Sequence, residues 1–220
     1  MSNKKKVIGI TGGIATGKSV VTSYLRTHGY EVIDADAVVR ELQEVGGALY
    51  LAIRDTFGEA YFLKNGELDR ATFGALIFSD SVARGKLSNV QDTIIRTELF
   101  GRCETNQSEI IFMDIPLLFE RDYTGFDETW LVYAPQDIQI KRLMKRNSLS
   151  ESEAMLRIKA QMPIDEKRSL ATRIIENCDT IEVLENQLAS LISEIERVLS
   201  EDGVRFLQRF ELGKIITFEI

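Results

Sequence analysis

The residues best suited to do chemistry lie in a glycine-rich loop near the N-terminus. From Gly12 the sequence reads GGIATGKS, so four residues separate Gly12 from Gly17, Lys18 and Ser19. This spacing is the phosphate-binding pattern called Walker A, in which backbone N–H groups and a helix N-terminus hold phosphate oxygens. Lys18 can reach the β- and γ-phosphates, and the Ser19 hydroxyl suits Mg²⁺. We therefore expect a nucleoside triphosphate site rather than an ordinary glycine turn. The residues expected to line it are Gly12, Gly13, Ile14, Ala15, Thr16, Gly17, Lys18, Ser19 and Val20.

Three aspartates stand where two other apolar segments end. The segment EVIDAD ends in Asp34 and Asp36, and IIFMD ends in Asp114. A carboxylate beside an acceptor hydroxyl can take its proton during phosphoryl transfer, so we expect this role for Asp34 or Asp36. The alternative is that both only cap the following helix. Asp114 fits the loose Walker B pattern, which predicts an acid close to Mg²⁺ or its waters.

Two arginines are spaced for one face of a helix. Arg142 and Arg146 are four residues apart, and Lys141 and Lys145 flank them. Arginine forks suit phosphate oxygens and can neutralise the charge that develops during transfer. A solvated basic face is the alternative, but together with the glycine-rich loop the pair predicts a lid that closes over phosphate.

The elements that position these groups alternate between strands and helices. Apolar, β-branched segments predict strands at 7–11, 31–36, 109–114, 129–134 and 172–177. Helical patterns occupy 19–29, most of 37–106, 136–147, 151–161 and the region from 179 onward. Ser150 with Glu153 and Asp179 with Glu182 predict capping boxes. This alternation predicts a parallel sheet with helices on both sides, and ligands bind beyond the carboxyl ends of such strands. The loop and the three aspartates all fall at that edge.

Length and composition narrow the class of protein. The chain has 220 residues and a formal net charge of −7, which argues against sequence-independent binding to nucleic acid. Its two cysteines are not in a CxxC pattern, as expected for free thiols in a reducing compartment. We find neither a signal-peptide core nor an apolar run of membrane-spanning length. We expect a soluble cytoplasmic protein without a membrane partner, and the oligomeric state stays open.

Together, several motifs resemble the dephospho-CoA kinase family. These are GITGGIATGKS, VIDAD followed by Arg40, FMDIPLLFE, and QIKRLMKRNSLSESEAMLRIKAQM with IIEN after it, and the likeness runs over about residues 6–197. The resemblance implies an α/β P-loop kinase fold with a five-stranded parallel sheet, a helical substrate-binding insert and a small lid. It implies ATP and Mg²⁺, and phosphorylation of the ribose 3′-hydroxyl of dephospho-CoA in the last step of coenzyme A biosynthesis.

The resemblance also assigns roles. Asp36 matches the base or hydroxyl-orienting acid, Lys18 matches the loop lysine, and Arg142 or Arg146 matches the lid arginine. The residues implied on the acceptor side are Asp34, Asp36, Arg40, Pro116 and Leu117, and the metal ligands are Ser19 and Asp114. Glu120 and Gln161 stand in matching motifs without an assigned mechanism.

The expected organisation is one kinase domain over 1–200. Its insert covers about 37–106 and its lid about 136–165, and the extension 201–220 has no assigned role. Ile216, Phe218 and Ile220 alternate in that extension, as in a hairpin strand. Asp92-Thr93 replaces a His-Pro pair usual in the family, and Ala15-Thr16 replaces Gly-Ser.

Three other functions fit parts of the sequence. A kinase for another small metabolite, such as a nucleoside monophosphate, would share the loop and the lid. A GTPase-like regulator usually has an Asn-Lys-x-Asp segment, which the chain lacks. A non-catalytic nucleotide binder would have no need of Lys18, Asp36 and Asp114 together.

Overall fold

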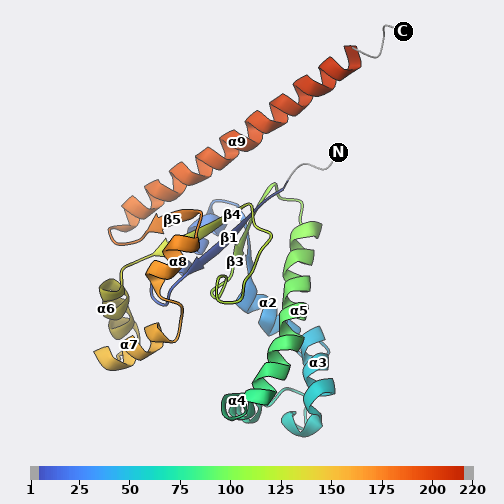
Figure 1. Cartoon of the computed structure of the whole chain (residues 1–220), viewed down its shortest axis with the longest axis vertical. Coiled ribbons are helices and arrows are strands. Elements are labelled where there is room, and N and C mark those ends of the chain that lie inside the picture. Colours follow the sequence, from blue (N-terminus) through green and yellow to red (C-terminus); the bar gives the residue numbers. More distant parts are fainter. Residues whose placement is uncertain (1–4, 216–220) are drawn as a thin grey trace.

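The computed structural model describes residues 5–215, with side chains described as far as Glu201. Strands and helices alternate through most of the chain (Figure 1). The strands are β1 (Lys6–Gly12), β2 (Glu31–Asp34), β3 (Ile110–Asp114), β4 (Glu128–Tyr133) and β5 (Arg173–Glu176). The helices are α1 (Lys18–Thr27), α2 (Ala35–Leu42), α3 (Ala48–Phe57), the short 3₁₀ helix η1 (Glu59–Tyr61), α4 (Arg70–Ser79), α5 (Ser81–Thr105), α6 (Gln136–Asn147), α7 (Glu151–Lys159), α8 (Ile164–Leu170) and α9 (Ile181–Ile215).

The five strands form one parallel sheet in the order β2-β3-β1-β4-β5, which confirms the expected fold class. The register aligns the carboxyl ends of the central strands. Asp114 pairs with Ile10 on one side and with Asp34 on the other, and Gly12 pairs with Val132. The glycine-rich loop and two of the three aspartates therefore start from one edge of the sheet.

Two hydrophobic cores cover the faces of the sheet. Alternate residues of β3 point to opposite sides, so Ile111 and Met113 join the core under α2, α3 and α5, whereas Phe112 joins the core under α1 and α9. Trp130 lies fully buried in the second core. Because both faces are covered, the strands are almost continuously apolar.

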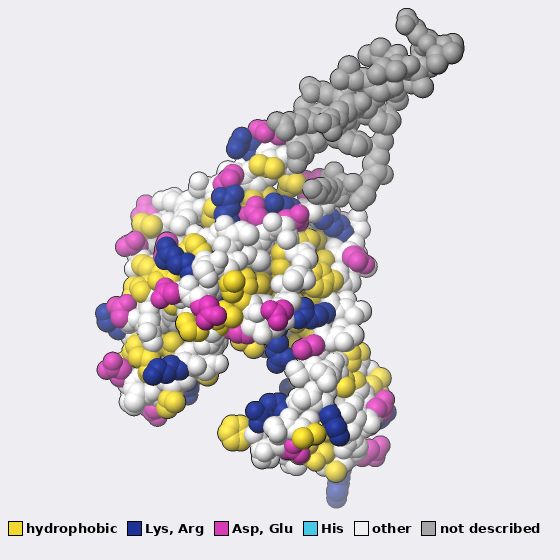
Figure 2. Space-filling view, viewed as in Figure 1, with side chains coloured by type: hydrophobic (Ala, Val, Ile, Leu, Met, Phe, Trp, Pro, Cys, Tyr) yellow, Lys and Arg dark blue, Asp and Glu magenta, His cyan; other side chains and the backbone are white. Residues whose placement is uncertain are grey.

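Two helical lobes extend below the sheet in Figure 1, one formed by α6 and α7 and the other by α3, α4 and the lower half of α5. The space-filling view shows a hollow between the two lobes (Figure 2). Each lobe follows the carboxyl end of a strand, since α2 follows β2 and α6 follows β4. The lobes therefore flank the edge that carries the glycine-rich loop.

Four details differ from the sequence-based expectations. Strand β2 ends at Asp34, so Asp36 lies in the first turn of α2, because the Asp34 carboxylate accepts from the Ala37 N–H and starts the helix. Helix α8 was not expected. The capping box at Ser150 is confirmed. At the start of α9, however, the Val183 N–H bonds to the Thr180 hydroxyl, so Thr180 caps this helix instead of the expected Asp179. Helix α9 continues to Ile215 in the C-terminal extension, and the expected hairpin strand at 216–220 lies outside the described residues.

Candidate active site

The glycine-rich loop joins β1 to α1 through two left-handed residues. Gly17 has φ 93° and Ala15 has φ 60°. The Thr16 N–H and hydroxyl both bond to the Gly13 carbonyl, at 3.2 and 2.9 Å, and close the loop on itself. A Cβ at Gly17 would overlap the Asn177 amide nitrogen, so this position needs glycine for both its conformation and its surroundings.

The loop lysine meets the aspartate of the neighbouring strand. Lys18 Nζ forms an ion pair with Asp114 Oδ1, and both side chains are mostly buried. Asp34 lies next to Asp114 in the register, and Asp34 and Asp36 both add negative charge around it. The structure therefore brings together the predicted loop lysine and the three predicted aspartates.

Burial is the main cause of a raised pKa at Asp114. Lys18 lowers the pKa through its charge and hydrogen bond, and the nearby Asp34 and Asp36 raise it further. The net direction is upward because desolvation of the carboxylate outweighs the lysine. Three carboxylates lie around Lys18 at this edge of the sheet, an arrangement that favours the binding of cations.

Asp34 and Asp36 have different surroundings. Asp34 is partly buried and caps α2 at 3.0 Å from the Ala37 nitrogen, whereas the side chain of Asp36 is exposed. Asp36 makes no hydrogen bond or ion pair with the described residues, and one turn further along α2 Arg40 is exposed as well. One of the two aspartates therefore has a structural role, and the other is available to a ligand.

The two arginines predicted to belong to a lid are also placed differently. Arg142 donates to the Thr16 carbonyl at 3.3 Å and to the Asn177 carbonyl at 2.9 Å, and so it braces the loop. The Asn177 side chain donates to the same Thr16 carbonyl at 2.7 Å. Arg146 is exposed, bonds only to its neighbour Asn147 at 2.9 Å, and has no ion pair within the described chain.

A second loop follows β3 and is held by hydrogen bonds from β1 and α8. The Pro116 carbonyl accepts from the Thr11 hydroxyl at 3.0 Å and from Lys167 Nζ at 3.3 Å, while Leu117 is 37% exposed. Glu120 pairs with the fully buried Lys167 at 2.7 Å. We call residues 115–123, which include the sequence PLLFE, the PLLFE loop. Its backbone is fixed from both sides, and it leaves an apolar side chain for a ligand to contact.

Three polar residues that hold the site received no role from the sequence, although Gln139 and Asn177 stand in motifs that carry the family resemblance. Asn177 supports the loop, and Lys167 supports the PLLFE loop. Gln139 is buried, donates to the Ala134 carbonyl at 2.8 Å, and lies close to Gly13. Asn177 and Gln139 lie after the ends of β5 and β4, so the rule that ligand sites gather at carboxyl ends of strands could have found them.

Asp92, where the family usually has histidine, forms an ion pair with Arg121 at 2.9 Å. Arg121 also donates to the Ser88 hydroxyl at 3.1 Å. Arg96, one turn further along α5, donates to the Asp122 and Arg121 carbonyls and stacks over Tyr123 at 4.0 Å. These contacts attach α5 to the end of the PLLFE loop.

Comparison with known proteins identifies the family to which the chain belongs. A family model described as dephospho-CoA kinase matches residues 6–182. The chain belongs to the dephospho-CoA kinase family. It is 50% identical to the dephospho-CoA kinase of Lactococcus lactis, with 86% of this chain and 98% of that protein covered. It is 49% identical to the dephospho-CoA kinase of Streptococcus pneumoniae serotype 4, with 85% and 94% covered.

Solved structures agree with membership of the dephospho-CoA kinase family. The Thermus thermophilus protein TT1252 superimposes with a TM-score of 0.73 at 36% identity, covering 87% of this chain and 98% of that one. The dephospho-CoA kinase from Campylobacter jejuni gives a TM-score of 0.66 at 26% identity, covering 88% and 98%. The fold is that of P-loop kinases, and the protein is a kinase. Within residues 5–215, no helix has the length and apolar character needed to cross a membrane.

Proposed function

We propose that this protein transfers the terminal phosphoryl group of ATP to the ribose 3′-hydroxyl of dephospho-CoA. Besides the family of the chain, one structural observation supports this proposal. The phosphate loop lysine and three aspartates meet at one sheet edge, between a lobe that follows β4 and a lobe that follows β2. We further propose that the reaction takes place in the cytoplasm, where ATP is supplied, and without nucleic acid as a partner.

The nucleotide side of the proposal rests on the loop. The remaining backbone N–H groups of the loop and the positive end of α1 would hold the β- and γ-phosphates, whereas the N–H groups of Ile14, Thr16 and Val20 already bond within the protein. Lys18 would exchange its bond to Asp114 for the phosphates, since a triphosphate offers more negative charge than one carboxylate. That exchange would leave the Asp114 carboxylate free at the site.

The acceptor side rests on Asp36. In the proposed step the bond between the γ-phosphorus and the β,γ-bridging oxygen breaks, the ribose oxygen forms the new bond, and its proton goes to Asp36. ADP leaves with the electron pair of the broken bond. Asp36 suits this role because it is exposed and has no protein partner among the described residues, whereas Asp34 is engaged as a cap. Arg40 and the backbone around Pro116 and Leu117 would contact the acceptor.

Mg²⁺ fits this site as a partner of the nucleotide. No three acidic, histidine or cysteine side chains of the described chain form a metal cage, but Mg²⁺ usually keeps waters and phosphate ligands and needs only one or two from the protein. Ser19 and Asp114 are the residues that would supply them. When bound, the ion neutralises charge on the phosphates. The excess of carboxylates around Asp114 fits a cation there.

The two arginines divide the work in this proposal. Arg142 keeps the loop in shape through the Thr16 carbonyl, and Arg146 turns toward the phosphates when the lid closes. This division follows from their contacts, because Arg142 already uses its guanidinium on two backbone carbonyls and Arg146 does not.

The test is phosphorylation of candidate acceptors by the purified protein with ATP and Mg²⁺. Dephospho-CoA, adenosine and AMP are offered in parallel, with Lys18→Ala as the blank. We expect turnover of dephospho-CoA far above the other two. Turnover of AMP or adenosine instead would favour a kinase for another small metabolite. ATP binding without transfer to any of the three would refute the proposed acceptor while leaving the nucleotide site intact.

A further inference from the structure

Gln161 contacts the phosphate loop from the lid. It follows α7, is half-buried, and its side-chain oxygen accepts from the Ile14 N–H at 2.8 Å. An N–H can bond only to the oxygen end of a carboxamide, so this contact fixes which way the side chain faces. The NH₂ end is therefore turned away from Ile14. It has no hydrogen-bond partner among the residues whose side chains are described.

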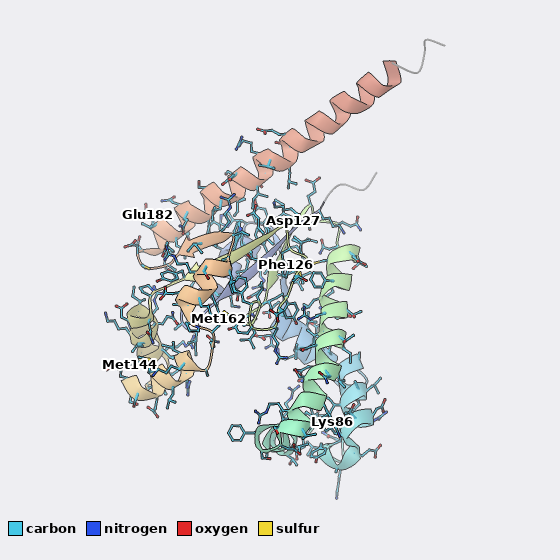
Figure 3. All side chains as sticks on the ribbon, in the orientation of Figure 1. Lys86, Phe126, Asp127, Met144, Met162 and Glu182 are labelled. Carbon is cyan, nitrogen blue, oxygen red and sulfur yellow. The ribbon has the colours of Figure 1, made fainter. Side chains whose placement is uncertain are left out.

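The residues next to Gln161 hold it in position. The Met162 N–H donates to Glu120 Oε1 at 3.3 Å, and Figure 3 shows Met162 on the link between α7 and α8. Glu120 is held in turn by Lys167, which also bonds the Pro116 carbonyl. This one link therefore joins the phosphate loop at Gln161 to the PLLFE loop at Met162.

We propose that Gln161 is a further catalytic residue, whose carboxamide NH₂ donates a hydrogen bond to the phosphoryl group in transfer. The bond from Ile14 orients the carboxamide, and Met162 fixes its distance from the PLLFE loop. The oxygens of a bound phosphoryl group accept hydrogen bonds, so the unpartnered NH₂ beside the loop can stabilise them without forming an ion pair that must break on release. This inference rests on the proposed kinase function and adds a residue to its transfer step.

The deciding measurement is binding of ADP and of a non-hydrolysable ATP analogue by calorimetry, for the wild type and Gln161→Ala. The two nucleotides differ at the γ-position. We expect the variant to lose about tenfold or more in affinity for the ATP analogue, as for removal of a charge-assisted hydrogen bond, and to bind ADP unchanged. Turnover in the standard assay should fall by at least as much.

Two other outcomes would overturn the proposal. Equal weakening of ADP and the ATP analogue would show that Gln161 only shapes the loop. Tighter binding of both nucleotides by the variant would show that the Gln161 side chain occupies the nucleotide site in the free protein and must move away before a nucleotide binds. Gln136→Ala is the matched control, since this glutamine is exposed on α6 and, among the described side chains, hydrogen-bonds only to the Met155 sulfur. We expect it to behave as the wild type.

The result is separable from the acceptor assignment. If the wild-type protein failed to phosphorylate dephospho-CoA, the proposed function would fail. The comparison of the ATP analogue with ADP would still decide whether Gln161 contacts the γ-phosphate, because it needs no acceptor.

Discussion

Replacement of Lys167 by methionine should strongly destabilise the protein. Lys167 is fully buried and pairs with Glu120 at 2.7 Å, while a second Glu120 oxygen is buried without a partner. Methionine keeps most of the side-chain volume but leaves the carboxylate with only the Met162 N–H. Removing one partner of a buried ion pair costs about 3–5 kcal/mol, and we expect the lower end because Glu120 is 18% exposed.

A double-mutant cycle separates the energy of the Lys167–Glu120 interaction from the contacts of each residue with its other neighbours. Glu120→Gln leaves Lys167 with the Pro116 carbonyl and the new amide oxygen, so it should cost about 1–3 kcal/mol. The double variant removes both charges, and its cost should fall short of the sum of the single costs by about 1–3 kcal/mol. The free energy of unfolding of all four proteins is measured by urea titration at neutral pH.

The neighbouring residue provides the control. Arg168 pairs with Glu176 at 2.8 Å, but both side chains are more than 40% exposed. Exposed ion pairs contribute roughly 0–1 kcal/mol, so Arg168→Met should cost far less than Lys167→Met. If the two variants were equally stable, or if the double variant cost the full sum of the singles, burial would not be what makes the first pair matter.

Three other predictions test the site and the core. Gly17→Ala should abolish measurable nucleotide binding, because its Cβ would overlap the Asn177 side chain. Gly29→Ala is the control: at φ 84° but in open space, it should cost about 1 kcal/mol of stability and leave binding intact. Calorimetry measures nucleotide binding by both variants, and urea unfolding measures their stability. Asp36→Asn should keep ATP affinity and lower turnover about a hundredfold or more, whereas Asp34→Asn, which keeps a good helix cap, should have a much smaller effect on turnover; loss of ATP binding by the first variant would contradict its assignment as base. Burial and a hydrogen bond to a glutamate of α9 raise the pKa of Tyr30 from 10.0 to about 12, so the folded state keeps the phenol proton that the unfolded state loses. Stability should therefore fall as pH rises through this window, and Tyr30→Phe should lessen that fall; an unchanged alkaline slope would show that the phenol does not contribute.

Local sequence signals predicted the strands and the loop because their causes are local. Each central strand is a short β-branched run buried on both faces, and the spacing of glycines around Lys18 sets the loop. The meeting of Lys18 with Asp114 could also be expected, because parallel strands bring their carboxyl ends to one edge. Helix α8 has only seven residues and a mixed composition, so no periodicity marks it.

The burial of Lys167 and the contact of Gln161 with the phosphate loop could not be read from the sequence. Lys167 has a basic side chain in a polar stretch and would normally be exposed. Its burial is explained only by the PLLFE loop, 51 residues away at Pro116. The same holds for Gln161 and Ile14, which are 147 residues apart. Such pairs depend on where the sheet order places the lid, and the hydrophobic pattern carries no information on that.

Asp92, which stands where the family resemblance implies a histidine, helps to attach α5 through its ion pair with Arg121. Its ion pair with Arg121 is about one-third exposed on each side, so by itself it contributes roughly 0–1 kcal/mol. The attachment is stronger than that pair, because Arg96 bonds two backbone carbonyls of the same loop and stacks on Tyr123. Carbonyls are present whatever the side chains are, so these contacts do not depend on the residue at position 92. The PLLFE loop thus keeps its place beside the phosphate loop with aspartate at position 92.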